Sequence, residues 1–471
     1  MASALKCSSL RRVALVTGII ATVATAQNPI VPGQGLCDPD IRIYDGRAYL
    51  YGSHDASLEN KTWKMDDWWV WASADLVNWK LESVLKPEDT YYGKPMSVCW
   101  ATTGATRAGK YYFYFSRGRD DTGVVVGDSP VGPWKDTLGK PLLTKESTPT
   151  KTSARDPAVL QDADGVNYIV FGKFDFYIAR LNDDMISLAE PPRLLELDRK
   201  NGPIAEGKTD DKPYLHRRGD QYYLSWGCFY AMSDSPYGPF KYKGSIVTKE
   251  RTNPTFQRRL LSDRHGTFFD FNGQSYFACN DLSSPGASNY FRNTLIAYVH
   301  YRDNGEIEPI HLTPQGVGSY DAKQNVIQAE DYFLVQGAKK RETPGGGFDV
   351  TGFTDGGRLA FPNVANLPAD TTAYVRLACA NPDGATIEFR SAAPDGPLLG
   401  RVDVPNTGDA AAYQTIACPL KNPAGKTDLH VVVRGRAGEF LRIDWLSFAI
   451  SGLTSSRSGS GPLSLVLTGE G

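Results

Sequence analysis

Five side chains that could do chemistry stand at regularly spaced points along the first part of the sequence. They are Asp38, Trp100, Asp156, Asp211 and His265, and each begins a strand–turn–strand pattern that recurs every 54–62 residues. Two carboxylates in one pocket can cleave a glycosidic bond: one, ionised, activates water, and the other, protonated, gives its proton to the leaving oxygen. A third carboxylate can adjust the pKa of the acid. An indole such as that of Trp100 offers a flat apolar face to the C–H surface of a sugar.

The local sequence around two of these carboxylates is the same. Asp38 and Asp156 each precede a proline. Because a residue before proline is biased towards extended backbone, we expect both aspartates to project from the beginning of a strand.

The repeat itself indicates the architecture that would bring these residues together. Each unit contains a hairpin with glycine near the turn and alternating apolar positions, and further strands follow at 70–79, 124–134 and 230–240. Five units of four strands predict an all-β fold, a five-bladed β-propeller over residues 27–310. In a propeller the first strand of each blade lies nearest the axis, so the five strand starts would meet in one central funnel.

The remaining segments predict a second domain and two termini without a fold of their own. Residues 311–325 are typical of a linker, residues 326–450 of a β-sandwich, and the Ser/Gly-rich residues 451–471 of a disordered tail. Residues 1–26 resemble a signal peptide, with Arg11 and Arg12 before an apolar run and Ala24-Thr25-Ala26 before the expected cleavage site. We therefore expect a secreted, extracellular protein.

Composition excludes several other classes of protein. Lys and Arg number 51 and Asp and Glu 53, a net charge of −2 that argues against a nucleic-acid partner. No later stretch has the roughly 20 apolar residues of a membrane span, so we expect no membrane partner. We also expect a monomer. In an oxidising compartment, Cys379 and Cys418 are the disulfide candidates, because no other cysteine lies in the second domain.

Five motifs in the first domain resemble glycoside hydrolase family 43, over about residues 28–310. They are Cys37-Asp38-Pro39-Asp40-Ile41, Trp100-Ala101, Arg155-Asp156-Pro157, Lys212-Pro213-Tyr214-Leu215 with the later Tyr222-Tyr223-Leu224-Ser225, and Arg264-His265-Gly266-Thr267-Phe268. The resemblance implies a five-bladed propeller and an inverting mechanism.

The same resemblance implies roles for individual residues. Asp38 corresponds to the general base and Asp156 to the aspartate that modulates the pKa of the acid. His265 corresponds to a histidine beside a bound calcium or its waters, so a structural calcium is possible, although the chemistry requires no cofactor. Arg292 corresponds to an arginine that reaches the sugar before the cleaved bond.

The general acid is where the sequence departs from this pattern. The family usually has Glu, a small residue and Pro at the start of blade four, whereas this chain has Asp211-Lys212-Pro213. Asp211 occupies the matching position, and Glu206, five residues earlier, could reach the pocket from a loop. Both remain candidates for the acid.

The second domain resembles a family 6 carbohydrate-binding module. The resemblance rests on Ala329-Glu330-Asp331-Tyr332, Pro405-Asn406-Thr407-Gly408 and Ile443-Asp444-Trp445. Ala410–Ala412 replace the usual sugar-binding aromatic, with Tyr413 just beyond, and Arg442 replaces the usual asparagine. The fold is therefore expected, but not the usual sugar cleft.

These observations predict a secreted, inverting exo-glycosidase acting on plant cell-wall polysaccharide or its oligosaccharides. An α-L-arabinofuranosidase or β-xylosidase is favoured, because these activities dominate the resembled family, and a galactan-active exo-enzyme is an alternative. The rival from another class is a non-catalytic, lectin-like propeller in which Asp211 marks a lost acid.

Overall fold

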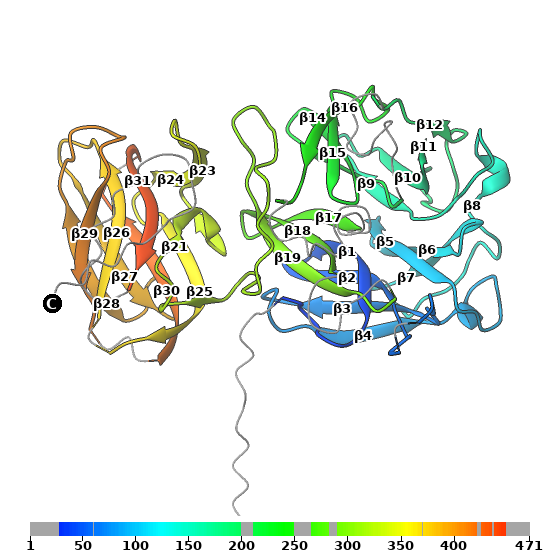
Figure 1. Ribbon diagram of the computed structural model, residues 1–471, viewed down its shortest axis with the longest axis horizontal. Coiled ribbons are helices and arrows are strands. Elements are labelled where there is room, and N and C mark those ends of the chain that lie inside the picture. Colours follow the sequence, from blue (N-terminus) through cyan, green and yellow to red (C-terminus); the bar gives the residue numbers. More distant parts are fainter. Residues whose placement is uncertain are drawn as a thin grey trace, which may run out of the picture.

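The computed structural model contains two β-rich bodies, which lie side by side in Figure 1. It describes residues 28–198 except 60, 211–248, 265–281, and 290–448 except 370, 422–424 and 436–437. The predicted signal peptide, the predicted tail and Glu206 lie outside the described residues. Within this part of the chain no helix has the length and apolar character needed to cross a membrane. Short 3-10 turns are present at Pro87–Asp89, Lys145–Ser147 and Ala329–Asp331.

The first body is a five-bladed β-propeller. Antiparallel neighbours are paired in chain order within each blade, and the fifth blade has three described strands. The first and second blades are β1 (Leu36–Tyr44), β2 (Arg47–His54), β3 (Trp68–Ser73), β4 (Lys80–Leu85), and β5 (Cys99–Arg107), β6 (Lys110–Arg117), β7 (Asp121–Gly127), β8 (Leu143–Thr144). The third and fourth are β9 (Ala158–Gln161), β10 (Asn167–Lys173), β11 (Asp175–Arg180), β12 (Arg193–Leu194), and β13 (Tyr214–Arg218), β14 (Gln221–Trp226), β15 (Phe229–Ser233), β16 (Lys241–Ser245). The fifth is β17 (Gly266–Phe271), β18 (Gln274–Asp281) and β19 (Asn293–Val299).

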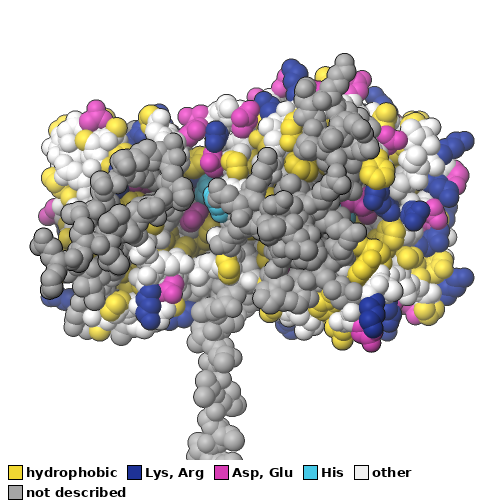
Figure 2. All heavy atoms as spheres, viewed as in Figure 1, with side chains coloured by type: hydrophobic (Ala, Val, Ile, Leu, Met, Phe, Trp, Pro, Cys, Tyr) yellow, Lys and Arg dark blue, Asp and Glu magenta, His cyan; other side chains and the backbone are white. Residues whose placement is uncertain are grey.

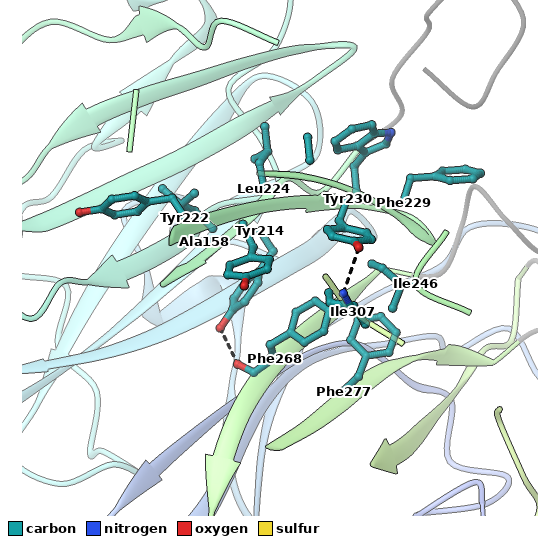
Figure 3. Close-up of a cluster of buried hydrophobic side chains, with 14 of the residues drawn as sticks. Ala158, Tyr214, Tyr222, Leu224, Phe229, Tyr230, Ile246, Phe268, Phe277 and Ile307 are labelled. Atoms are coloured by element: carbon teal, nitrogen blue, oxygen red, sulfur yellow. Dashed lines mark hydrogen bonds between the residues drawn. The ribbon is translucent and has the colours of Figure 1, made fainter. Parts of the chain in front are cut away.

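Blade packing explains the aromatic-rich sequence. A middle strand such as β3 is buried at every position, because both faces of a blade pack against its neighbours, whereas the outer β4 is largely exposed. A cluster formed by the third, fourth and fifth blades contains Tyr214, Tyr222, Leu224, Tyr230, Ile246, Phe268, Phe277 and Ile307 (Figure 3). Two of its hydroxyls pair with main-chain groups: the Tyr214 hydroxyl donates to the Phe268 carbonyl at 3.0 Å, and the Tyr230 hydroxyl accepts from the Ile307 amide at 3.0 Å.

Near the propeller axis, one buried ion pair joins three blades. Arg42 Nε lies 2.8 Å from Asp40 Oδ2, and Arg42 Nη2 donates to Thr103 Oγ1 at 2.8 Å and to the Val159 carbonyl at 2.9 Å. Asp40 Oδ2 also accepts from Thr103 Oγ1 at 2.9 Å and from the Gly104 amide at 2.8 Å. The pair therefore fixes the first strands of blades one, two and three relative to one another.

The N-terminal segment closes the ring. The Asn28 side chain donates to the Ile296 carbonyl and accepts from the Ile296 amide, both at 2.9 Å. The Ile30 amide donates to the Thr294 carbonyl at 3.0 Å. The segment that leads into the first blade thus runs along β19 of the fifth blade. These hydrogen bonds hold the two ends of the propeller together.

The second body is a β-sandwich of two mostly antiparallel sheets. One has the order β20-β25-β30-β27-β28, with β22 also paired to β25, and the other β23-β24-β31-β26-β29, with β21 paired to β31. The strands are β20 (Tyr320–Asp321), β21 (Ile327–Gln328), β22 (Leu334–Gln336), β23 (Lys339–Glu342), β24 (Phe348–Phe353), β25 (Arg358–Leu367), β26 (Thr372–Cys379), β27 (Ala385–Ser391), β28 (Leu398–Val404), β29 (Gln414–Pro419), β30 (Gly425–Arg434) and β31 (Gly438–Ser447). The first of them, β20, falls within the stretch predicted as a linker.

The two bodies share a hydrogen-bonded, apolar contact. Gln274 Nε2 donates to the carbonyls of Glu330 at 2.8 Å and Tyr332 at 3.0 Å, and the Tyr332 hydroxyl donates to the Gly273 carbonyl at 3.0 Å. Phe333 packs into a hydrophobic cluster of the propeller, its ring 5.8 Å from that of Phe271. The sandwich is therefore docked on the fifth blade.

The predicted disulfide between Cys379 and Cys418 is wrong, because both thiols are free. Cys418 lies opposite Ala373 at one end of β26, whereas Cys379 is the last residue of that strand. At about 3.3 Å per residue, the six intervening steps separate them by roughly 20 Å, far beyond the reach of a disulfide.

We expect the central ion pair to matter more to stability than a surface pair. Replacing Arg42 by Met leaves the buried Asp40 carboxylate without its cation, which should lower the free energy of unfolding of the propeller by about 3–5 kcal/mol. Arg47→Met is the matched control, because Arg47 pairs with Glu82 at the surface, and should cost about 1 kcal/mol or less. Urea unfolding followed by tryptophan fluorescence measures both, and equal small losses would contradict the central role of Arg42.

Candidate active site

The five sequence-predicted positions line one cavity at the propeller axis, with a volume of about 580 Å³. Asp38 comes from β1 and Trp100 from β5, while Asp156, Asp211 and His265 come from the segments just before β9, β13 and β17. Arg292, the sixth predicted residue of the site, precedes β19 and also lines the cavity. Every blade therefore contributes at least one of the residues that the spacing singled out.

The backbone at the aspartates is not extended, and that prediction is wrong. Asp38 has φ +49° and Asp156 has φ +58°, and Lys212, which also precedes a proline, has φ +49°. A positive φ is unfavourable for a residue with a side chain. Side chains stabilise it here: the Asp38 amide donates to Asn280 Oδ1 at 2.7 Å, and the Asp156 amide donates to Ser116 Oγ at 2.8 Å.

Several donor side chains surround the Asp38 carboxylate. Oδ1 accepts from Arg292 Nη1 at 2.7 Å, from Asn280 Nδ2 at 2.8 Å and lies 2.8 Å from His265 Nδ1. Oδ2 accepts from Ser53 Oγ at 2.9 Å. Burial raises the pKa of Asp38, but Arg292 and then His265 outweigh it and hold this pKa well below its ordinary value. Asp38 is therefore ionised, as a group that activates water must be.

Asp156 has a different environment. Its Oδ2 lies 3.4 Å from Arg155 Nε, and its side chain is almost fully buried. Burial raises the pKa of Asp156; the Arg155 cation lowers it and the neighbouring Asp211 carboxylate raises it again, so the net direction is upward. Of the three cavity carboxyls, this one holds a proton most readily.

Asp211 points into the cavity and is surrounded by cations. Its Oδ1 lies 2.6 Å from His265 Nε2, and its Oδ2 accepts from Lys173 Nζ at 3.2 Å and from Arg155 Nη2 at 3.3 Å. Burial raises the pKa of Asp211, but His265, Lys173 and Arg155 together lower it below its ordinary value. Without substrate, therefore, Asp211 is ionised.

His265 bridges the two carboxylates through its two ring nitrogens. Burial lowers its pKa, but Asp211 and Asp38 raise it to about 10, so the ring is a cation that donates to both. The ring nitrogens are about 2 Å apart, which places the two Oδ1 atoms roughly 7 Å from each other, within the separation of about 6.5–9.5 Å typical of inverting glycosidases.

The residues present do not fit the expected calcium beside His265. Both of its nitrogens donate to carboxylates, so neither has a lone pair for a metal ion. Among the described residues, no group of three or more His, Cys, Asp or Glu side chains could hold one either.

The arginine and the indole predicted to bind sugar are both held by other groups. Arg292 donates to Asp55 as well, from Nε at 2.8 Å and from Nη2 at 3.0 Å, which locks the guanidinium between two buried carboxylates. The Trp100 ring carries the Arg155 guanidinium 4.9 Å from its centre. The Arg292 guanidinium and the Trp100 indole are thereby held in place before a ligand binds.

Several cavity residues escaped the sequence analysis because they fall outside the repeat positions. Trp63 lies in the loop before β3, 43% exposed, with Arg292 4.9 Å from its ring centre. Lys173 is the last residue of β10, and Phe174, which is 53% exposed, forms the turn to β11. The only available signal was the aromatic and basic character of these turns, which strand periodicity ignores.

Comparison with known proteins agrees with the geometry. The model of glycosyl hydrolases family 43 matches residues 26–307, more than half of the chain. The chain belongs to this family. Residues 328–449 match the family 6 carbohydrate-binding module, so the sandwich is such a module docked on a family 43 propeller.

Individual relatives of this family 43 hydrolase are distant. An arabinoxylan arabinofuranohydrolase of Paenibacillus polymyxa is 26% identical, over 91% of this chain and 75% of the relative. A xylosidase/arabinosidase of Bacteroides ovatus is 29% identical, over 60% of this chain and 97% of the relative. A solved β-xylosidase/α-arabinofuranosidase from a compost microbial metagenome, in complex with xylotriose and in a calcium-free form, superposes with a TM-score of 0.52 at 26% identity, covering 61% of this chain and 98% of that one.

Membership of the family makes the chain a glycoside hydrolase, of a family that acts with inversion and needs no cofactor. This leaves no ground for the rival interpretation as a non-catalytic propeller.

Charged side chains of both signs are interspersed over the described surface in Figure 2, in keeping with the near-neutral net charge.

In the binding module, Arg442, which replaces the usual asparagine, and Tyr413, which follows Ala410–Ala412, share one hydrogen-bond partner. The Tyr413 hydroxyl and Arg442 Nη1 both donate to Asp349 Oδ2, the latter at 3.3 Å. Arg376, which also pairs with Asp444, lies 4.4 Å from the centre of the Tyr413 ring and covers one face. A ring whose face and hydroxyl are both occupied offers little to a sugar.

We expect Tyr413→Ala to leave polysaccharide retention unchanged. Native affinity electrophoresis of the full chain in xylan and arabinan gels is the measurement, in an Asp38→Asn background that prevents digestion. Trp63→Ala, which alters the cavity of the propeller, is the comparison and should reduce retardation. Loss of retardation on Tyr413→Ala alone would show that the module binds sugar through this face.

Proposed function

We propose that the protein is a secreted exo-glycosidase that releases arabinofuranosyl or xylosyl units from plant cell-wall polysaccharide or its oligosaccharides, with inversion. The observation that carries the proposal is the pair Asp38 and Asp211 facing each other across one cavity, held by His265, with Asp156 beside them. The activities of the two relatives and of the solved enzyme favour these two sugars. None of these three proteins is a galactan-active enzyme.

In this proposal Asp38 is the general base. Its low pKa keeps it ionised, and Arg292 and Asn280 hold it in place, so that it can take a proton from a water in the gap of roughly 7 Å between the two carboxylates. Arg292 and Trp100, which both line the cavity, contact the bound sugar.

Asp211 is proposed as the general acid, and Asp156 as the group that modulates it. The acid must be protonated when substrate is bound, although Asp211 is ionised without it. A sugar in the cavity removes water from a carboxyl whose side chain is still 15% exposed, which raises its pKa. The carboxylates of Asp156 and Asp211 repel each other, so an ionised Asp156 acts in the same direction. Glu206, outside the described residues, stays the alternative acid.

Release of sugar from a defined panel tests the proposal. Full-length protein is incubated with arabinoxylan, arabinan, galactan, xylo-oligosaccharides and aryl glycosides, and products are separated by anion-exchange chromatography. Arabinose or xylose as the sole early product supports it. Galactose as the main product, or oligosaccharides released from internal cleavage, would overturn it.

We expect Asp211→Asn to distinguish substrates by their leaving groups. Activity on natural oligosaccharides should fall by about 10²–10⁴-fold, the usual contribution of general acid catalysis. Activity on a dinitrophenyl glycoside should fall far less, because that leaving group needs little protonation. Glu206→Gln is the matched variant: if it shows this pattern and Asp211→Asn does not, Glu206 is the acid.

We also expect Lys173→Met to shift the pH profile. Lys173 stabilises the ionised form of Asp211, so its removal should raise the pKa of this acid. Because the acid is active when protonated, the loss of activity on the alkaline side should then begin at higher pH. The profile of kcat/KM is measured beside that of Lys241→Met, an exposed lysine of β16, and an unshifted or downward-shifted alkaline limb contradicts the assignment.

A further inference from the structure

The catalytic cavity holds more positive than negative groups. Five cations line it, namely Arg119, Arg155, Lys173, His265 and Arg292, beside the three carboxylates Asp38, Asp156 and Asp211. A fourth carboxylate, the buried Asp55, does not line the cavity but pairs with Arg292. Even when Asp55 is included, one positive charge remains in excess, whereas a cavity for neutral sugars needs no net charge.

Four of the five cations are neutralised within the site. Arg155 contacts Asp156 and Asp211, and His265 contacts Asp38 and Asp211. Lys173 and Arg292 likewise lie within 3.2 Å and 2.7 Å of a carboxylate oxygen. The excess charge is therefore not spread evenly over the cavity.

Arg119 is the cation without a counter-ion. It lies in the turn between β6 and β7, and its carbonyl accepts hydrogen bonds from the Ala154 amide and Ser153 Oγ, both at 3.2 Å. These bonds fix its backbone next to Arg155. Its guanidinium makes no hydrogen bond or ion pair with any residue that the structure describes, and the residue is exposed.

The position of Arg119 relative to the carboxylates indicates which part of a substrate it would meet. The segment that anchors it, Ser153–Arg155, runs directly into Asp156, and Arg155 contacts Asp211. Lys173, with 30% of its side chain exposed, also contacts Asp211. Lys173 thus contacts the proposed acid, which faces the leaving group, and Arg119 is anchored beside Arg155, which contacts the same acid.

We propose that the cavity recognises a carboxylated sugar, a uronic acid, on the leaving-group side of the cleaved bond. The planar guanidinium of Arg119 matches a carboxylate in a two-point hydrogen bond, and Lys173 adds a second positive charge beside it. This inference rests on the proposed function for the direction of the substrate. It adds that acidic oligosaccharides, rather than neutral ones, are the preferred substrates.

The test uses one pair of substrates that differ only in charge. A uronic-acid-bearing arabinoxylo-oligosaccharide is compared with the same oligosaccharide after its carboxyl group has been reduced to the alcohol. For the wild-type chain at low salt we expect kcat/KM to be about tenfold higher on the acidic form, the size of one charge-assisted hydrogen bond. The ratio should shrink in 0.5 M NaCl, because exposed charges are screened.

The variants decide whether Arg119 is responsible. In Arg119→Gln the ratio should fall to about one, whereas in Lys241→Gln, which removes an exposed charge outside the cavity, it should stay as in the wild type. A wild-type ratio of one or below overturns the proposal, and so does a preference that survives Arg119→Gln.

A binding measurement separates this proposal from the proposed function. Titration calorimetry with the inactive Asp38→Asn full chain compares the same two oligosaccharides without any need for cleavage. If the wild type hydrolyses neither oligosaccharide, the proposed function fails. Tighter binding of the acidic form would still support the carboxylate site, provided that this preference is lost in the Asp38→Asn, Arg119→Gln double variant. Equal binding of the two forms overturns it.

Discussion

The site depends on one physical constraint, the cost of burying negative charge at the axis of a β-propeller. Asp38 is 2% exposed and Asp156 3% exposed, and both carboxyls face Asp211 across a small cavity. An isolated carboxylate in such a place would take up a proton. The imidazolium of His265 and the guanidinium groups of Arg155 and Arg292 each contact two carboxylates at once, and they keep Asp38 and Asp211 ionised. At Asp156 burial outweighs them, so its pKa stays raised.

The propeller is built to hold those charges at fixed separations. Its first strands are joined near the axis by the pair Arg42 and Asp40, and the ring is closed by Asn28 on β19. Because blades one, three, four and five supply the paired charged groups, none of these four blades can shift without breaking an ion pair. The same rigid frame gives Asp38, Asp156 and Asp211 three different environments, and so three different tendencies to hold a proton.

Much of the fold and of the candidate site could be predicted from the sequence. The features that could not be predicted all depend on contacts between residues far apart in the chain. Repeat spacing predicts five blades and the convergence of Asp38, Asp156, Asp211 and His265, because these follow from local pattern alone. It could not predict that Arg292 pairs with Asp55, 237 residues away, nor the positive φ of Asp38, which requires the side chain of Asn280. The disulfide prediction failed because counting cysteines ignores strand register, which places Cys418 beside Ala373.

The central claim is that Asp38 activates water on the face of the sugar opposite the leaving group. The most direct measurement is anion rescue of Asp38→Gly, in which a small nucleophile occupies the space left by the base. With an activated aryl glycoside and added azide, the account predicts recovery of activity and a glycosyl azide of inverted anomeric configuration, assigned by proton NMR. A glycosyl azide of retained configuration, or an Asp38→Gly variant that is fully active without azide, would contradict it.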